Sequence, residues 1–231
     1  MDSFENKYAN IKDMRKAKLD CYRVERYNEV VPDAHPINKE NGKYLINTLA
    51  KVLSENGVDL ILAYGTLLGA IREHDFIGHD LDMDTMIWAK DMQKVLDLVS
   101  ELEKYGIELD CYALPWIITF KYKDITCDLD VIWGAPAPWK KHFVLIQSYF
   151  VPRKLFAKTT KIEFQGQIHV VPADYEKVLV YHYGKNWRIP SSKHARIPSY
   201  FFFGYYVKRF FRRGFRFMGR IVNKMLGKNG K

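Results

Sequence analysis

The chain has 231 residues, of which 48% are hydrophobic and 27% charged, a composition that is typical of globular proteins and excludes an extensively disordered one. Its 36 Lys and Arg residues outnumber its 27 Asp and Glu residues and give a formal net charge of +9, but nine of the basic residues and no acid lie in residues 200–231. Residues 1–199 are therefore formally neutral, which excludes a nucleic-acid-binding surface spread over the whole protein, because such binding rests on neutralising phosphates.

Helices and strands alternate in the first half of the neutral body. Apolar residues at helical spacing predict a helix over Lys39–Asn56, and the next residue, Gly57, is a stop signal. The apolar run Val58–Tyr64 is short and predicts a buried strand. The Gly65-Thr66 pair follows, and Thr66 is the expected N-cap of a short helix through Arg72.

Strands dominate the central part of the chain. Residues Leu81–Trp88 alternate apolar and polar side chains, which predicts a strand with acids along one face. A second amphipathic helix is expected over Asp91–Tyr105. Three further strands are expected over Ile107–Ala113, Trp116–Tyr122 and Thr126–Trp133.

A proline-rich loop and a hairpin close the body. The loop is Gly134–Trp139 (GAPAPW), and the hairpin covers Lys161–Val171 with its turn at Gln165-Gly166. Pro172 is expected to open a helix through Tyr183, ended by Gly184. The order of elements predicts one α/β domain with a mixed sheet flanked by helices.

Acids and a Gly-Thr turn gather in the middle of this pattern. Asp82 and Asp84 stand two residues apart on a predicted strand, so both side chains point to one face. Two hard oxygen ligands suit Mg²⁺ or Mn²⁺, and Asp128 or Asp130 on another strand offers a third acid. The turn at Gly65-Thr66 supplies a helix N-terminus, whose free N–H groups favour a phosphate. Metal-assisted phosphoryl or nucleotidyl transfer needs this combination of parts.

The stretch that holds the acid pair resembles the signature of LicD-like phosphotransferases, a family that includes the fukutin-related proteins and belongs to the nucleotidyltransferase superfold. The resemblance rests on Tyr64–Arg72 (YGTLLGAIR), then Phe76-Ile77, then Asp80, Asp82 and Asp84. The chain departs from the family at Leu81, where relatives often carry an additional acid. This departure leaves the pair Asp82 and Asp84 intact.

A second patch is similar to the closing motif of the same family. It consists of Val171-Pro172, followed by Tyr183–Trp187 (YGKNW) and Pro190. The two patches together span Val58–Pro190, which is more than half of the chain. The resemblance therefore implies a nucleotidyltransferase-like mixed sheet for residues 1–199.

The resemblance also implies an activity and a set of site residues. The activity is transfer of a substituted phosphate, such as phosphocholine or an alditol phosphate, from a CDP-linked donor to a sugar hydroxyl of a glycan or lipid-linked glycan. The expected metal-binding and catalytic acids are Asp82, Asp84 and Asp130. The expected substrate-binding residues are Gly65 and Thr66, through their amides, Arg72, through its guanidinium, and Asp80 and Asp128, with Asp128 as the alternative third acid.

Simpler interpretations remain open for several of these residues. Acid pairs of this spacing are common on solvated strand faces. Arg72 could simply pair with Glu73 or Asp75, and Gly65 and Gly69 could serve only close helix packing. The same acids would also serve a nucleotidyltransferase that moves a nucleoside monophosphate to a small molecule or protein. A non-catalytic membrane-binding or nucleic-acid-binding module is the alternative of another class.

The basic residues at the C-terminus predict a separate function for residues 200–231. In a helical projection, Lys208, Arg209, Arg212, Arg213, Arg216, Arg220 and Lys224 fall on one side, and Phe, Ile, Val and Met fall on the other. This pattern is typical of an interfacial helix on an anionic membrane, whereas a helix docked on the body or a nucleic-acid arm explains only one of the two faces.

The remaining features favour the cytoplasm. No apolar stretch approaches the ~18–20 residues of a membrane-spanning helix, and Met1–Asn10 is unlike a signal peptide. The three widely spaced cysteines are expected to be reduced thiols. We therefore expect a cytoplasmic enzyme that binds peripherally to the inner face of a membrane, and we do not expect nucleic acid as a partner.

Overall fold

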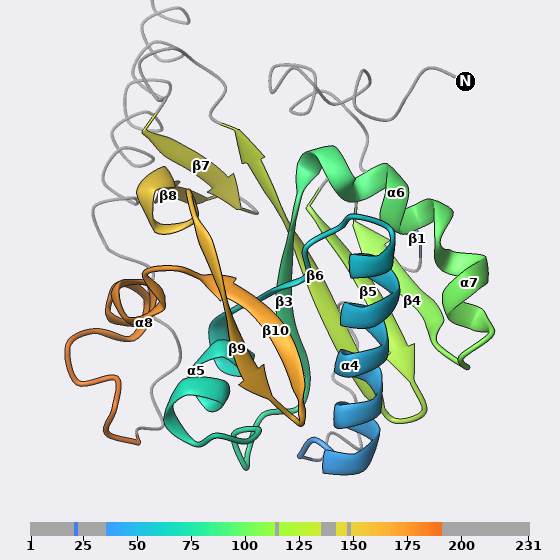
Figure 1. Cartoon of the computed structure of the whole chain (residues 1–231), viewed down its shortest axis with the longest axis horizontal. Coiled ribbons are helices and arrows are strands. Elements are labelled where there is room, and N and C mark those ends of the chain that lie inside the picture. Colours follow the sequence, from blue (N-terminus) through green and yellow to red (C-terminus); the bar gives the residue numbers. More distant parts are fainter. Residues whose placement is uncertain (1–20, 23–35, 114–115, 135–141, 147–148, 191–231) are drawn as a thin grey trace, which may run out of the picture.

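The computed structural model describes residues 21–22, 36–113, 116–134, 142–146 and 149–190. These residues form one mixed sheet with helices packed against it (Figure 1), so the predicted α/β fold class is confirmed. The predicted amphipathic helix in residues 200–231, the domain boundary at residue 199 and most of the proline-rich loop lie outside the described residues. No helix in the described part of the chain combines the length and the hydropathy needed to cross a bilayer.

The sheet has ten strands within the described ranges. They are β1 (Cys21–Tyr22), β2 (Ile61–Leu62), β3 (Met83–Trp88), β4 (Glu108–Ala113), β5 (Ile117–Tyr122), β6 (Ile125–Gly134), β7 (Phe143–Ile146), β8 (Tyr149–Pro152), β9 (Thr159–Phe164) and β10 (Gln167–Pro172). Their order is β1-β4-β5-β6-β3-β2-β10-β9, and β7 pairs with β6 and β8. The pairs β3/β6 and β2/β10 are parallel and the others are antiparallel.

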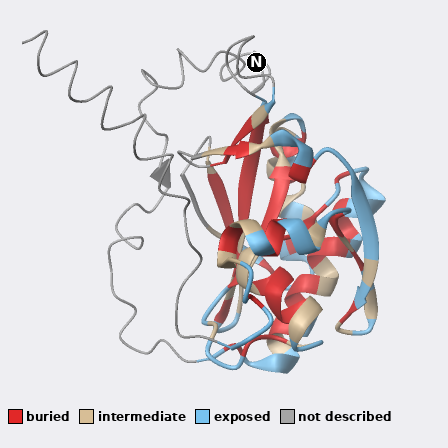
Figure 2. Ribbon diagram, turned by 90° about the vertical axis from the view of Figure 1, so that its left-hand side faces the viewer, coloured by how far each residue is buried: buried red, intermediate tan, exposed pale blue. Residues whose placement is uncertain are grey.

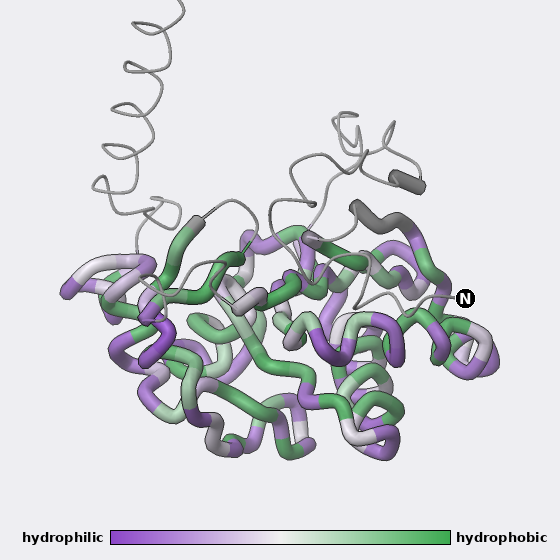
Figure 3. Tube along the Cα trace, turned by 90° about the horizontal axis from the view of Figure 1, so that it is seen from above, coloured by the Kyte–Doolittle hydropathy of each residue, from purple (hydrophilic) through white to green (hydrophobic). Residues whose placement is uncertain are grey.

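Among the described residues, the helices other than α4 (Lys39–Glu55) are short. The others are α5 (Tyr64–Arg72), α6 (Met92–Asp97), α7 (Val99–Glu103) and α8 (Tyr175–Tyr183), with 3₁₀ turns η1 (Ala89–Asp91) and η3 (Arg153–Leu155). Helix α4 begins where the Asn38 side chain accepts a hydrogen bond from the Asn41 amide at 3.2 Å. In Figure 3, hydrophilic and hydrophobic residues alternate along the helices, which is the amphipathic pattern that buries one face.

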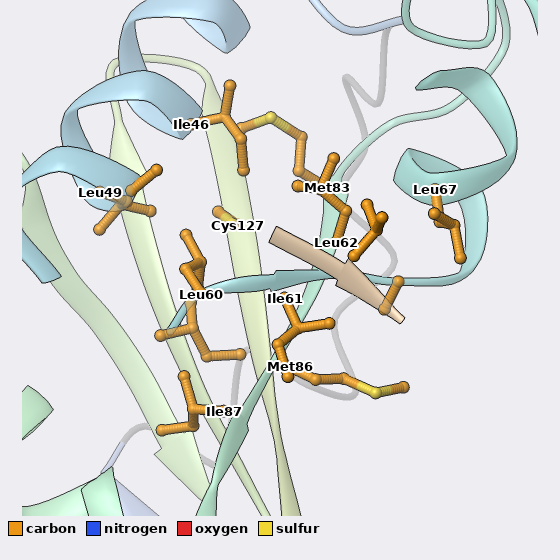
Figure 4. Close-up of a cluster of buried hydrophobic side chains, with 14 of the residues drawn as sticks. Ile46, Leu49, Leu60, Ile61, Leu62, Leu67, Met83, Met86, Ile87 and Cys127 are labelled. Atoms are coloured by element: carbon orange, nitrogen blue, oxygen red, sulfur yellow. The ribbon is translucent and has the colours of Figure 1, made fainter. Parts of the chain in front are cut away.

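The hydrophobic core lies between α4 and the central strands. Ile46 and Leu49 of α4 contribute to the same buried cluster as Met83 of β3 and Cys127 of β6 (Figure 4). The central strands are buried along most of their length, while the outer faces of the helices are exposed (Figure 2). Because successive side chains of a strand point to opposite faces, the even-numbered residues of β3 and β6 point away from α4.

Several sequence predictions are confirmed as elements. The predicted helix over Lys39–Asn56 corresponds to α4, and the three predicted central strands correspond to β4, β5 and β6. The predicted hairpin is formed by β9 and β10, and both turn residues, Gln165 and Gly166, have positive φ values of 53° and 76°. Positive φ at both central positions is the requirement of a type I′ two-residue hairpin turn.

Several element boundaries were wrong. The helix expected over Asp91–Tyr105 is divided into η1, α6 and α7, with the break between the two α-helices at Leu98. Pro172 ends β10 and does not open a helix, because it pairs with Thr159 in the hairpin and α8 begins only at Tyr175. The strand expected over Val58–Tyr64 is reduced to β2, because α5 begins at Tyr64.

Candidate active site

Parallel pairing of β3 and β6 brings the predicted acids together. Asp84 of β3 is the register partner of Asp128 of β6. Asp130 follows two residues later, opposite Met86, and therefore lies on the same face of the sheet. The sequence analysis predicted Asp84 on one strand and Asp128 and Asp130 on another. The pairing of these strands places all three acids on the face of the sheet that points away from α4.

Asp82 lies just outside the strand that was expected to hold it. Strand β3 begins at Met83, and Asp82 is an exposed residue of the preceding segment. Its negative charge nevertheless interacts with both Asp84 and Asp128. The acid pair therefore consists of one carboxylate on the strand and one on the segment that leads into it, and not of two carboxylates on one strand.

Asp84 is held in place by the N-terminus of α5. The Gly65 amide donates a hydrogen bond to Asp84 Oδ2 at 3.0 Å, and the Asp84 amide donates one to Thr66 Oγ1 at 2.8 Å. The Ala63 amide donates to the Asp84 carbonyl at 3.1 Å. Three bonds thus fix the backbone and the carboxylate of Asp84 against the start of one helix.

The prediction that Thr66 caps α5 was wrong. The N-cap of α5 is Ala63, which makes no side-chain capping bond, and the helix begins at Tyr64. Tyr64 has a φ of 37°, in the left-handed region that few non-glycine residues adopt. Only Ala63 separates the end of β2 from Tyr64, the first residue of α5. Thr66 is only 3% exposed, and its hydroxyl serves Asp84 and not the helix end.

Gly65 lets two carboxylates approach the backbone. A Cβ atom at Gly65 would stand 2.6 Å from Asp80 Oδ2 and 3.1 Å from Asp84 Oδ2, so a side chain fits there only if these carboxylates turn aside. At Gly69 the Cβ would instead stand 2.6 Å from the backbone carbonyl oxygen of Asp75. Close helix packing therefore accounts for Gly69. At Gly65 the close neighbours are instead carboxylates of the candidate site.

Five carboxylates form what we call the acid cluster (Asp80, Asp82, Asp84, Asp128 and Asp130), and the pKa values of the first four are raised above their ordinary value. Burial raises the pKa of Asp84 well above its ordinary value, and the charges of Asp82, Asp128 and Asp130 raise it further. Burial raises the pKa of Asp128 to about 7, to which the neighbouring acids also contribute. The fold therefore makes ionisation of Asp84 and Asp128 unfavourable, and a positively charged ligand would offset this cost.

Thr119 of β5 is a contact of the acid cluster that the sequence analysis missed. Its hydroxyl donates a hydrogen bond to Asp128 Oδ1 at 2.6 Å, which opposes part of the rise in the pKa of Asp128. Thr119 and Asp128 are register partners on antiparallel strands. The available signal was one hydroxyl residue in an otherwise apolar run, Ile117–Phe120, but its partner depends on strand pairing.

Arg72 at the end of α5 is already engaged within the protein. Its Nε donates to Glu73 Oε1 at 2.6 Å and its Nη1 donates to the Trp187 carbonyl at 3.2 Å. The alternative pairing with Glu73 is thus confirmed, while Asp75 pairs with Lys39. The positive charge of Arg72 also acts on Asp80 and lowers its pKa against the larger effect of burial. Arg72 therefore borders the acid cluster in a fixed orientation.

The acid cluster fits a hard divalent cation in its chemistry. Its donors are carboxylate oxygens, which Mg²⁺ and Mn²⁺ prefer. Burial and, to a smaller extent, repulsion between the acids raise the pKa of Asp84, and a cation would offset both effects. Within the described ranges, no three His, Cys, Asp or Glu side chains are already gathered as ligands of a single ion. Magnesium in phosphate-transfer sites usually takes one or two carboxylates and completes its shell with water and substrate phosphates.

The family of the chain follows from a match to a family model. The model described as LicD/FKTN/FKRP, nucleotidyltransferase domain matches residues 57–174, more than half of the chain and the whole acid cluster. The chain belongs to the LicD family. Membership supports a transferase with phosphotransferase-type activity on a nucleotidyltransferase-like fold. The match includes Val171-Pro172 of the second patch of resemblance and ends before Tyr183–Trp187 and Pro190.

Other comparisons add less. The search of the curated proteins found no match. Among solved structures, the LicD-family chain is similar to a lincomycin-bound crystal structure of the lincosamide antibiotic adenylyltransferase LnuA. The two share 16% sequence identity with a TM-score of 0.43, over 62% of this chain and 85% of that chain.

Proposed function

We propose that this LicD-family protein transfers a substituted phosphate, of the phosphocholine or alditol-phosphate type, from a CDP-linked donor to a sugar hydroxyl of a glycan or lipid-linked glycan. One observation carries the proposal. The pairing of β3 with β6 sets Asp84 beside Asp128, with Asp130 on the same face and the N-terminus of α5 against Asp84. The family membership supports the class of reaction, and the CDP donor and the glycan acceptor are the finer part of the proposal.

The acids divide into metal ligands and a proton acceptor. Asp82 and Asp84 would hold Mg²⁺ or Mn²⁺, with Asp130 as the third acid and Asp128 as its alternative. The ion, when bound, supplies positive charge that offsets the charge of the diphosphate. Thr119 orients Asp128 through its hydroxyl, and burial to 4% exposure holds Asp130 in one position.

The proposed reaction is an in-line displacement at phosphorus. The acceptor hydroxyl oxygen forms a bond to the phosphorus that bears the substituent, the bond from that phosphorus to the bridging oxygen breaks, and CMP leaves with the oxygen. Asp130, or Asp128, accepts the hydroxyl proton. Two N–H groups of the Arg72 guanidinium are bonded to Glu73 and Trp187. Its other N–H groups would bind the diphosphate, for which the planar guanidinium is suited.

The backbone amides of Gly65 and Thr66 are proposed to hold a phosphate of the donor. The Gly65 amide is bonded to Asp84 Oδ2, so a phosphate could receive its hydrogen bond only if that carboxylate turned away. A cation on Asp84 would favour such a turn, because it competes for the same oxygen. The roles of Gly65 and Thr66 toward the donor stay predictions.

The second candidate function is nucleotidyl transfer, which the nucleotidyltransferase description of the family model favours. Both reactions use the same acids but break different bonds. Incubation with Mg²⁺, acceptor extract and a CDP-donor labelled in the cytidine or in the substituent separates them. Release of labelled CMP with the substituent on the acceptor supports phosphotransfer, whereas cytidine label on the acceptor would show nucleotidyl transfer.

We also propose that residues 200–231 bind an anionic membrane at the inner face, where lipid-linked acceptors are presented. The proposal rests on the sequence pattern alone, because these residues lie outside the described part of the chain. The full chain should float with vesicles that contain anionic lipid, and a variant ending at Ser199 should not. Equal flotation of the two proteins would reject the membrane role.

A further inference from the structure

Tyr183 lies at the end of α8, between two contacts that tie α8 and the residues after it to the acid cluster. The preceding residue, His182, packs its ring edge-on against Tyr64 with centroids 4.8 Å apart, and Tyr64 directly precedes Gly65. Four residues after Tyr183, the Trp187 carbonyl accepts the hydrogen bond from Arg72. The end of α8 is therefore held against both ends of α5.

The segment after α8 is itself anchored, which makes this placement stable. Trp187 is 3% exposed, and its amide donates to the Gly184 carbonyl at 3.2 Å. The guanidinium of Arg188 stacks over the Trp187 ring at 4.2 Å and pairs with Glu176 at the start of α8. Tyr183 is thus the last residue of a short helix, and the segment that follows it is fixed to the core through Trp187.

The surroundings of the Tyr183 hydroxyl belong to the acid cluster. Tyr183 is half-buried, and its phenol interacts electrostatically with Asp84, Asp80 and Arg72. The phenol of Tyr183 therefore lies within electrostatic range of the carboxylates at Gly65 and of the guanidinium that borders them. Neither the family match, which ends at residue 174, nor the sequence analysis gave Tyr183 a role.

We propose that Tyr183 contacts the substrate, and that its hydroxyl donates a hydrogen bond to a phosphoryl oxygen of the nucleoside diphosphate held between Asp84 and Arg72. The inference rests on the proposed function, because it assumes that a diphosphate occupies this site. A phosphate oxygen can only accept hydrogen bonds, so a site lined by carboxylates needs neutral or cationic donors beside the metal. Tyr183 and Arg72 are donors that α8 and α5 bring to the acid cluster.

The protonation of Tyr183 agrees with a donor role. Burial raises the pKa of Tyr183 well above its ordinary value, and the charges of Asp84 and Asp80 raise it further. The phenol therefore stays protonated at neutral pH and adds no negative charge to the acid cluster.

The test is calorimetric titration of the full chain with CDP in the presence of Mg²⁺. The variant Tyr183→Phe removes only the hydroxyl and should weaken CDP binding about tenfold, since a hydrogen bond to a charged group has that value. The matched control is Tyr175→Phe, which makes the same change at the other end of α8, where the residue is equally half-buried. It should bind CDP as the wild type does, and both variants should keep the wild-type Tm.

Three results would overturn the inference. Tyr183→Phe could bind CDP as tightly as the wild type while Asp82→Asn with Asp84→Asn loses binding, in which case the proposed function survives and the role of Tyr183 fails. Tyr183→Phe could lower the Tm by several degrees, which would make the hydroxyl structural. A wild-type chain that binds no CDP with Mg²⁺ would overturn the proposed function together with this inference.

Discussion

Asp84 is the residue on which the local structure converges. Two amides and one hydroxyl fix it to the start of α5, and four other carboxylates lie near it. This arrangement costs stability, because burial and like charges both disfavour the ionised carboxylate. Such a cost is typical of functional sites, where charge is arranged for a ligand and not for the fold.

Removing the charge of Asp84 should separate function from stability. We expect Asp84→Asn to lower kcat/KM at least about 100-fold, because it removes a charge that the metal requires. The Tm should stay equal or rise, because the amide carries no buried charge but can still accept the Gly65 hydrogen bond. Turnover with Mg²⁺ and thermal unfolding measure the two effects.

The matched control for this change is Asp59→Asn. Asp59 is an exposed acid that precedes β2, outside the acid cluster. It should leave both turnover and Tm unchanged. An Asp84→Asn variant with wild-type turnover would remove Asp84 from the metal site.

Asp128 gives a pH dependence whose sign follows from the direction of its pKa shift. Its pKa is about 7 in the folded protein and about 4 when unfolded, so between these values the folded state binds more protons. The contribution of Asp128 to stability therefore falls as the pH rises from about 4 to about 7. We expect the Tm of Asp128→Asn, relative to that of the wild type, to rise from pH 5 to pH 8 and to be about 5 °C higher at pH 8.

Comparison of the two proteins at each pH isolates this contribution from that of the buried histidines. The pKa values of His169 and His182 are lowered to about 4 by burial, so their contributions to stability rise with pH from about 4 to about 6.5. These contributions are the same in the wild type and in Asp128→Asn. A Tm difference that does not change between pH 5 and pH 8 would contradict the assigned protonation of Asp128.

At the scale of elements, α5 joins the acids to the fold. Its first turn carries Gly65 against two carboxylates, its middle carries Gly69 against the backbone of Asp75, and its end carries Arg72. Helix α5 is therefore in contact with the loop before β3, with β3 itself and with the segment after α8. One short helix thus sets the geometry of groups from three separate parts of the chain.

Two alanine substitutions in α5 should have opposite consequences. Gly65→Ala puts a methyl group among carboxylate oxygens, which can turn aside, so we expect at least about a tenfold loss of turnover and little change in Tm. Gly69→Ala puts the methyl group against a backbone carbonyl, which cannot turn aside, so we expect a loss of about 2 kcal/mol of unfolding free energy. Kinetics and denaturant unfolding of both variants check the pair.

Gly78→Ala is the control, because no atom lies within 4 Å of its added Cβ. It should be silent in both measurements. If Gly65→Ala lost stability and kept its turnover, the packing interpretation would hold for Gly65 as well.

Much of the molecule could be predicted because its signals are local. The spacing of apolar residues predicted α4 and the central strands, and the positions of the acids in the sequence identified them as candidate ligands. Which acids meet could not be predicted, because the Asp84 and Asp128 register depends on the pairing of β3 with β6 across 44 residues of chain. The Thr119 contact was missed because its partner, Asp128, is set by the register of β5 with β6. The β7–β8 hairpin was not among the predicted elements.

At the scale of the whole molecule, the central claim is that the acid cluster binds a divalent cation together with a nucleoside diphosphate. Titration of the protein with Mn²⁺, followed by the loss of its free electron paramagnetic resonance signal, measures this binding directly. We predict that CDP tightens Mn²⁺ binding to the wild type, and that Asp82→Asn with Asp84→Asn weakens it at least about tenfold with the fold intact. Equal Mn²⁺ binding by the two proteins in the presence of CDP would contradict the account.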